Sequence, residues 1–276
     1  MVTETKTKEV KIELPYVPTP RQRKAHQARE TNVLFGGAVG GGKTIWLCNE
    51  GIQLSLDYPG NVGFMARHEL TSFKKTTLLS LEETMPDGLV SRHNKQDQVF
   101  DLINGSKIMY GGLGDDKNAI ERLKSMNLGW FGIDQAEETT ESHFFMLASR
   151  LRLNVPNIHY KALLTANPEP GWVKDRFVDN HYDDHVFIPS LPSDNPYLPK
   201  DYESKLRLLY ANNPELVKAL LEGNWDVTMS GDFLIPYSLI RAAASRKSDT
   251  LGGNCEMGVD VARFGDDETV VMVRHG

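Results

Sequence analysis

Short apolar runs alternate with longer segments of helical periodicity along most of this chain. The apolar runs, each typical of a buried strand, span residues 31–37, 61–67, 127–134 and 159–168. The segments with a helical pattern span residues 21–30, 43–59, about 69–84, about 116–124 and about 140–152. Strands that alternate with helices predict a mostly parallel sheet with helices on both faces, which is an α/β fold.

Two other segments have the pattern of hairpins. In residues 98–112, Asn104 and Gly105 supply the turn, because both residue types tolerate a positive φ. Residues 255–276 predict a strand, a turn that contains Asp266 and Asp267, and a return strand. A two-stranded hairpin is not a domain, so we interpret this last segment as the truncated start of a second domain.

The segments outside the α/β pattern differ from it in composition. Residues 1–20 are charged and then proline-rich, which is typical of an extended arm. Beyond about residue 190 the sequence predicts a loop and two short helices, and residues 241–254 form a polar connector. One large α/β unit is therefore expected between an arm and a C-terminal region of another kind.

A glycine-rich loop directly follows the first apolar run and matches the pattern G-x-x-x-x-G-K-[ST]. Its residues are Gly37, Gly40, Gly41, Gly42, Lys43 and Thr44. Glycines let backbone N–H groups converge on phosphate oxygens, and the following helix adds its dipole. We predict a nucleoside triphosphate site in which Lys43 reaches the β- and γ-phosphates and the Thr44 hydroxyl binds Mg²⁺.

The apolar run 127–134 ends in a carboxylate, Asp134, at the place of a Mg²⁺-binding Walker B aspartate. Hydrolysis also needs a group that orients and deprotonates water. A glutamate directly after the aspartate commonly does this, but here the next residue is Gln135, with Glu137 and Glu138 within one turn. Either Gln135 positions water without acting as a base, or a later glutamate reaches the site; we favour Glu137.

Overall composition narrows the class of protein. The net charge of −6 argues against a whole-surface grip on nucleic acid, although a local basic strip remains compatible with it. The charged N-terminus lacks the apolar centre of a signal peptide, and no apolar run has the length that spans a bilayer. Cys48 and Cys255 lie far apart without metal-type spacing, so a reducing compartment such as the cytoplasm is expected.

Five segments together resemble the large terminase subunit of tailed bacteriophages, an ATP-driven motor that packages DNA into procapsids. They are PTPRQRKAH, GFMARHELTSFKKT, GIDQAEE, LLTANPEPGWVKDRF and GVDVARFGDDETVVMV, in that order. The first is similar to the adenine-contacting Q motif of helicases and terminases, with Gln22 as the contact. The fourth resembles the terminase block NP-x-x-x-W-x-x-x-x-F. The resemblance extends from about residue 18 to residue 276.

The resemblance implies a P-loop NTPase of RecA-like fold and a division of the chain. After the arm come an ATPase core over residues 21–194 and a small helical lid over residues 195–240. A linker over residues 241–254 then leads to the start of an RNase H-like nuclease domain over residues 255–276.

The resemblance also assigns parts to particular residues. Thr165 and Asn167 would sense the γ-phosphate after the coupling strand. Asp260 resembles the first metal ligand of the nuclease, whose remaining carboxylates come from other strands, so that metal site is expected to be incomplete in this chain. Asp266 and Asp267 are turn residues in this interpretation.

Two positions depart from the family pattern. Terminases of this group often carry Asp-Glu at Walker B, and Gln135 breaks that pair. Some also donate an arginine to the ATP of a neighbouring subunit, and here its position holds a lysine. The candidates for this trans-acting cation are Arg122, Lys124, Arg150 and Arg152.

By resemblance, the expected function is ATP hydrolysis, with Mg²⁺, coupled to translocation of double-stranded DNA into a procapsid. The expected partners are DNA, the procapsid portal, the small terminase subunit and other copies of the chain in a ring, in the host cytoplasm and without a membrane. Lys74, Lys75 and Arg92 are candidates for a basic DNA-contacting face. Two alternatives stay open: a helicase-like ATPase, and a non-hydrolysing module in which ATP cements a ring.

Overall fold

An eight-stranded sheet forms the centre of the larger of two units, Met1–Asp232 and Phe233–Gly276. The computed structural model describes residues 12, 14–114, 123–226, 255–261 and 269–275. Six strands run parallel: β1 (Asn32–Gly37), β2 (Val62–Arg67), β5 (Lys107–Gly112), β6 (Trp130–Ile133), β7 (Lys161–Ala166) and β8 (His185–Ser190). This confirms the mostly parallel α/β sheet that the sequence predicts.

An antiparallel edge extends the sheet beyond β5. Strand β4 (Val99–Leu102) pairs with β5, and β3 (Val90–Asn94) pairs with β4, so the strand order is β3-β4-β5-β2-β6-β7-β1-β8. The predicted turn between β4 and β5 is confirmed: Gly105 has a φ of 83°, and its N–H donates to the Leu102 carbonyl at 3.0 Å.

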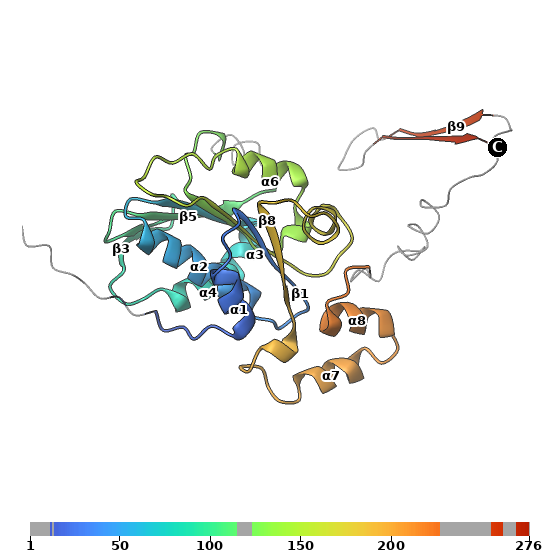
Figure 1. Cartoon of the computed structure of the whole chain (residues 1–276), viewed down its shortest axis with the longest axis horizontal. Helices are drawn as coiled ribbons and strands as arrows, with labels where there is room; N and C mark the ends of the chain where they lie inside the picture. The colour runs from blue at the N-terminus through green and yellow to red at the C-terminus, as the bar shows by residue number, and fades with distance from the viewer. Residues whose placement is uncertain (1–11, 13, 115–122, 227–254, 262–268, 276) are drawn as a thin grey trace, which may run out of the picture. The chain divides into compact units, whose positions relative to one another are not determined.

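Four helices cover one face of the sheet (Figure 1). They are α1 (Pro20–His26), α2 (Lys43–Asp57), α3 (Leu70–Lys75) and α4 (Thr77–Thr84). Large side chains from both layers fill the space between them, among them Phe35, Trp46, Met65 and Trp130, all fully buried. Burial of these side chains fixes α2 across the centre of the sheet, with its first residue at the end of β1.

The opposite face is covered by α6 (Glu141–Ala148) and by a single π-helical turn, η2 (Lys174–Asp179). The core on this side holds Phe131, Phe144 and Phe177, with aromatic rings about 6 Å apart. Both faces of the central strands are therefore buried, which explains why their sequences are continuous apolar runs.

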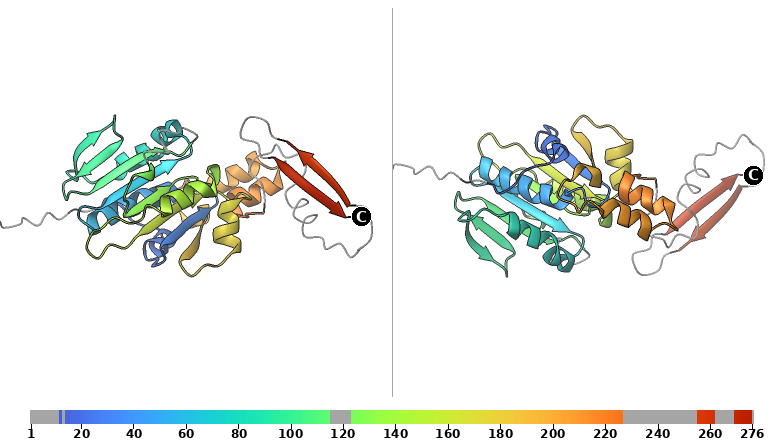
Figure 2. Two further views of the ribbon diagram at one scale, coloured as in Figure 1. Left: turned by 90° about the horizontal axis from the view of Figure 1, so that it is seen from above. Right: turned by 90° about the horizontal axis from the view of Figure 1, so that it is seen from below.

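Two further helices follow the last strand of the sheet. Helices α7 (Tyr202–Leu209) and α8 (Pro214–Glu222) lie side by side in all views (Figure 1, Figure 2). The Val39 N–H, in the loop after β1, donates to the Leu220 carbonyl of α8 at 3.1 Å. Trp225, just beyond α8, is buried in the second core. This helical pair is therefore fastened to the loop between β1 and α2.

The second unit contains an antiparallel pair, β9 (Cys255–Asp260) and β10 (Val270–His275), in register from Asp260–Val270 to Cys255–His275. The predicted strand and return strand are confirmed, whereas the acidic turn with Asp266 and Asp267 lies outside the described residues. Within the described part of the chain, no helix is both long enough and apolar enough to cross a membrane.

Some predicted helices have different bounds. The helix expected over residues 69–84 is broken at Thr76, which has φ −130° and ψ −75°. Its hydroxyl accepts a hydrogen bond from Arg67, and the hydroxyl of Thr77 donates to Asp134, so contacts with the sheet override a continuous helix. Helices α1 and α6 end at His26 and Ala148, earlier than predicted. The helix expected over 116–124 lies mostly outside the described residues.

The sequence pattern missed two strands, β3 and β8. Both are edge strands, where one side of the backbone has no strand partner. β8 contains Pro189, which pairs with Gly36 and which cannot donate a ladder hydrogen bond. A proline inside a short run argues against a central strand, but it is compatible with an edge.

The Trp130 indole predicts one glycine that the fold cannot replace. A Cβ at Gly63 would lie 2.0 Å from Trp130 Cε2. We expect Gly63→Ala to lower the free energy of unfolding by about 1–3 kcal/mol, because the overpacked core must shift. Urea denaturation measures this. Gly258→Ala is the control, since a Cβ there meets nothing within 4 Å; equal effects of both substitutions would contradict the prediction.

Candidate functional site

The loop between β1 and α2 has a backbone that only glycine permits at two positions. A Cβ at Gly41 would lie 1.8 Å from the Ser190 hydroxyl, which donates to the Gly41 carbonyl at 3.0 Å. Gly42, the N-cap of α2, has a φ of 76°. No side chain caps the first turn of α2, so its backbone donors are left for an anion.

The Lys43 ammonium folds back over this loop. It donates to the carbonyls of Gly37 at 2.9 Å and Ala38 at 2.7 Å. Burial lowers the pKa of Lys43 to about 8, although the nearby Glu137 and Asp134 favour its charged form. The lysine is thus held inside the loop by neutral acceptors that a phosphate can replace.

Asp134, the first residue after β6, is the centre of a hydrogen-bond network. Its carboxylate accepts from the hydroxyls of Thr44 at 3.1 Å, Thr77 at 2.6 Å and Thr165 at 2.5 Å. The Asp134 side chain is buried. The structure therefore brings together Thr44, Asp134 and Thr165, which the sequence places 121 positions apart at most.

The donor set at Asp134 fits Mg²⁺. That ion takes oxygen ligands and is commonly bound by one or two carboxylates plus phosphate oxygens. The Asp134 carboxylate and the Thr44 hydroxyl supply two protein oxygens in contact with each other. No group of three or more His, Cys, Asp or Glu residues suited to a metal occurs in the described residues, so the remaining ligands would be phosphate and water.

A cavity of about 410 Å³ opens over the loop and over the ends of the central strands. Its polar lining residues are Lys43, Thr44, Arg67, Thr76, Asp134, Gln135, Thr165 and Asn167. The carboxyl ends of parallel strands are where α/β folds bind ligands. Phosphate-binding donors, a Mg²⁺-type carboxylate and polar strand ends share this one cavity.

Glu137 lies behind the cavity wall, next to Asn167. The Asn167 amide donates to Glu137 Oε1 at 2.7 Å, while Oε2 is buried without a hydrogen-bond partner. Burial raises the pKa of Glu137 to about 7, and the Asn167 hydrogen bonds and the Lys43 charge limit the rise. A carboxyl poised near neutral pH is suited to general acid–base chemistry.

The two neighbouring candidates are placed differently. Gln135 lines the cavity in a left-handed conformation, φ 54°, and its N–H donates to the Thr165 hydroxyl at 3.1 Å. Glu138 accepts from Arg67 through both carboxylate oxygens, at 2.9 and 3.1 Å. The structure therefore gives Gln135, Glu137 and Glu138 three separate surroundings. Arg67 is a site residue that the sequence reasoning missed; its place at the end of a central strand was the available signal.

Side chains from two distant segments brace the loop from outside. Gln22 in α1 donates to the Gly42 carbonyl at 2.9 Å, and its Oε1 accepts from the Thr19 N–H at 2.8 Å. Asn195, after β8, donates to the Gly40 carbonyl at 2.6 Å. Gln22 is thus next to the loop, as its predicted adenine contact requires, although both ends of its amide are already hydrogen-bonded.

The four candidates for a trans-acting cation do not line the cavity. Arg150 donates to the Lys124 carbonyl, and Arg152 donates to Asn127 Oδ1 at 2.7 Å. Lys124 and Arg152 are exposed, and Arg122 lies outside the described residues.

The remaining predicted positions lie elsewhere in the chain. Lys74, Lys75 and Arg92 are exposed, the first two in the last turn of α3 and the third on β3. Asp260 is exposed at the end of β9, and no metal-type cluster of described residues includes it.

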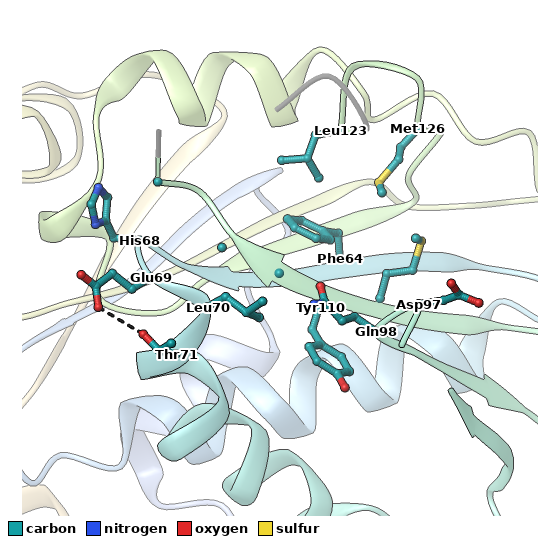
Figure 3. Close-up of a pocket in the computed structure, with 14 residues that line it drawn as sticks. Phe64, His68, Glu69, Leu70, Thr71, Asp97, Gln98, Tyr110, Leu123 and Met126 are labelled. Carbon is teal, nitrogen blue, oxygen red and sulfur yellow. Dashed lines mark hydrogen bonds between the residues drawn. The ribbon is translucent and has the colours of Figure 1, made fainter. Parts of the chain in front are cut away.

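A second cavity, of about 340 Å³, lies beside β2 and β5 and is mainly apolar (Figure 3). Phe64, Leu123 and Met126 converge on it, and Glu69 accepts from the Thr71 hydroxyl at its rim at 3.4 Å. It contains neither the glycine-rich loop nor Asp134. The chemistry of phosphate binding therefore belongs to the first cavity.

The glycine-rich loop between a parallel strand and a helix, facing a strand-end aspartate, defines the P-loop class of α/β proteins. A family model for the phage terminase large subunit matches residues 28–224. The chain belongs to this family. Among curated proteins, no match was found.

Solved structures of similar fold come from three phages. The large terminase of a thermophilic bacteriophage is 15% identical with a TM-score of 0.67, over 75% of this chain and 53% of that one. The ATPase domain of the Thermus phage P74-26 large terminase is 13% identical with a TM-score of 0.57, over 77% and 95%. The HK97 bacteriophage large terminase is 10% identical with a TM-score of 0.56, over 94% and 63%. The matched region spans about half the length of the first of these terminases.

The buried Glu137 carboxyl predicts a pH-dependent stability. Its pKa in the folded protein is about 7, above the ordinary value of 4.5, so folding favours its protonated form. Stability is then lost as pH rises through this window. Without nucleotide, we expect Glu137→Gln to raise the midpoint of thermal unfolding at pH above 7 but not at pH below 4.5.

The matched control is Glu83→Gln, because Glu83 is exposed on α4. Scanning calorimetry at several pH values measures both variants. A Glu137→Gln midpoint that follows the wild type across the whole pH range would show that the buried carboxylate costs no stability.

Proposed function

We propose that this chain is the ATP-hydrolysing part of a viral DNA-packaging motor. It couples ATP hydrolysis to the movement of double-stranded DNA into a procapsid. The observation that carries the proposal is that Lys43, Asp134 and the Asn167–Glu137 pair meet around one cavity at the carboxyl ends of β1, β6 and β7. Family membership supports it.

Nucleotide binding has further support from the related structures. The large terminase from the first of the three phages has been solved in complex with ADP and with ATP-gamma-S. In this chain we assign the phosphates to the backbone donors of Gly40–Thr44 and to Lys43, which exchanges the Gly37 and Ala38 carbonyls for phosphate oxygens. Gln22 lies on the side of the loop where the base is expected.

Thr44 and Asp134 would hold Mg²⁺, which supplies charge neutralisation at the phosphates when bound. In our proposal Glu137 is the general base: it accepts the proton of the water that attacks the γ-phosphorus, and Asn167 orients it through the 2.7 Å hydrogen bond. Thr165 joins Asp134 to the Gln135 backbone. Loss of the γ-phosphate therefore reaches β7 through Thr165 and Asn167, which act as sensors.

The partners follow from the packaging function. We propose that copies of the chain form a ring on the procapsid portal, work with the small terminase subunit and act in the host cytoplasm. One of Arg122, Lys124, Arg150 and Arg152 would complete the site of the neighbouring copy. Lys74, Lys75 and Arg92, all exposed, are candidates for contacts with DNA phosphates. Asp260 would belong to the metal site of a nuclease domain.

One observation favours a second function. Gln135 lines the cavity at the position where a catalytic glutamate is common, and an amide cannot act as a base. In that case the chain would bind ATP to cement a ring without hydrolysing it. Turnover by the assembled protein separates the two functions.

Three substitutions test the proposal through phosphate release by the assembled ring. We expect Lys43→Ala and Glu137→Gln each to lower kcat by about 10²-fold or more, through lost phosphate stabilisation and lost general base catalysis. Gln135→Ala should have the smaller effect, since Gln135 is not the base. The absence of turnover by wild-type protein with DNA present would instead support the ring-cementing function.

The pH profile of hydrolysis gives an independent test. Glu137 must be deprotonated to accept a proton, and burial raises its pKa to about 7, so kcat falls below that pH. Lys43 must be protonated to bind phosphate, and burial lowers its pKa to about 8, so activity also falls above that pH. Single-turnover rates should give a narrow bell. The residual activity of Glu137→Gln should lack the acidic limb, and a profile identical to wild type would exclude Glu137 as the base.

A further inference from the structure

Arg67 occupies a position that places a cation inside the proposed ATP site. It is the last residue of β2, and the preceding residue, Ala66, pairs with Ile133 of β6. The Asp134 N–H donates to the Ala66 carbonyl at 2.8 Å, so Arg67 and Asp134 emerge next to each other from adjacent strands. Arg67 lines the same cavity as Lys43.

The Arg67 guanidinium is buried but incompletely satisfied. Nη2 donates to both oxygens of Glu138, and Nη1 donates to the Thr76 hydroxyl at 3.1 Å. Nε is buried and has no hydrogen-bond partner, and the side chain is only 11% exposed. A buried donor without an acceptor costs free energy, so an additional anion in the cavity would find an unfilled donor on Arg67.

We propose that Arg67 binds the γ-phosphate of ATP within the same chain, and that Glu138 holds it until a triphosphate enters. This inference rests on the proposed ATPase function. A planar guanidinium matches two phosphate oxygens at once, which a lysine cannot do. With ATP bound, Arg67 transfers its donors from Glu138 to γ-phosphate oxygens, and Glu138 turns to solvent.

Exposure makes this exchange energetically accessible. The Glu138 side chain is 39% exposed, so the released carboxylate is hydrated. Arg67 exchanges one anion for another and is never left as an unpaired buried charge, which is the costly outcome when a buried ion pair breaks. ADP has no γ-phosphate to compete with Glu138, so Arg67 keeps its carboxylate partner and distinguishes ATP from ADP.

The same geometry separates two adjacent carboxylates. Glu137 is hydrogen-bonded to Asn167 and faces inward, whereas both oxygens of Glu138 are engaged by Arg67. Glu137 is therefore available as the base, and Glu138 acts on the reaction only through Arg67.

The test is the affinity for ATPγS and for ADP, measured with the full chain by calorimetric titration in the presence of Mg²⁺. We expect Arg67→Gln to weaken ATPγS binding by about tenfold, the size of one charge-assisted hydrogen bond, and to leave ADP binding unchanged. Glu138→Gln should tighten ATPγS binding and leave ADP unchanged, because Arg67 is already released. The double variant should bind like Arg67→Gln.

Arg176 and Glu141 provide a matched control. They form another arginine–glutamate pair, at 2.8 Å, with side chains 16% and 41% exposed, and neither lines the cavity. Arg176→Gln and Glu141→Gln should alter neither affinity. If Arg67→Gln fails to fold, as judged by urea denaturation, Glu138→Gln decides the matter alone.

The inference is overturned if Arg67→Gln weakens both nucleotides equally or neither, or if Glu138→Gln leaves ATPγS binding unchanged or weaker. Failure of the proposed ATPase function is a distinct result. In that event wild-type protein binds neither nucleotide, or Lys43→Ala binds both as tightly as wild type.

Discussion

The buried carboxylate of Asp134 is the group on which the arrangement of the site depends. A buried charge is stable only when it is fully hydrogen-bonded, and three threonine hydroxyls meet this need: Thr44 at the start of α2, Thr77 at the start of α4 and Thr165 near the end of β7. These bonds draw three elements to one point. They also explain the break between α3 and α4, since a continuous helix would carry Thr77 away from Asp134.

The charges around Asp134 follow one rule in the nucleotide-free protein: each cation is held by acceptors that a phosphate can replace. Lys43 is held by backbone carbonyls of its own loop, and Arg67 is held by Glu138. Burial disfavours the ionised forms of both Lys43 and Glu137, shifting their pKa values toward neutrality from opposite sides. A polyanion entering this cavity therefore meets donors that are already in position, at small reorganisation cost.

The phosphate loop is also the point at which the helical pair α7–α8 joins the sheet. Asn195 and Ser190 donate to carbonyls of the loop, and the Val39 N–H donates to Leu220 of α8. The loop is thus braced by the segment that leads into α7 and by α8 itself. Gln22 holds it from the opposite side. Any displacement of the loop backbone would therefore be felt in these helices.

The sequence by itself determined the order of elements, the parallel sheet and the phosphate loop, because apolar periodicity and the G-x-x-x-x-G-K-T pattern are local properties of the chain. It also pointed to Asp134, since a carboxylate after an apolar strand needs no distant information. Only the tertiary structure decided which groups meet Asp134. The edge strand β8 was hidden by Pro189, which is acceptable only because β8 pairs on one side. Arg67 escaped notice because its partner, Glu138, lies 71 residues away and reaches it only through the pairing of β2 with β6.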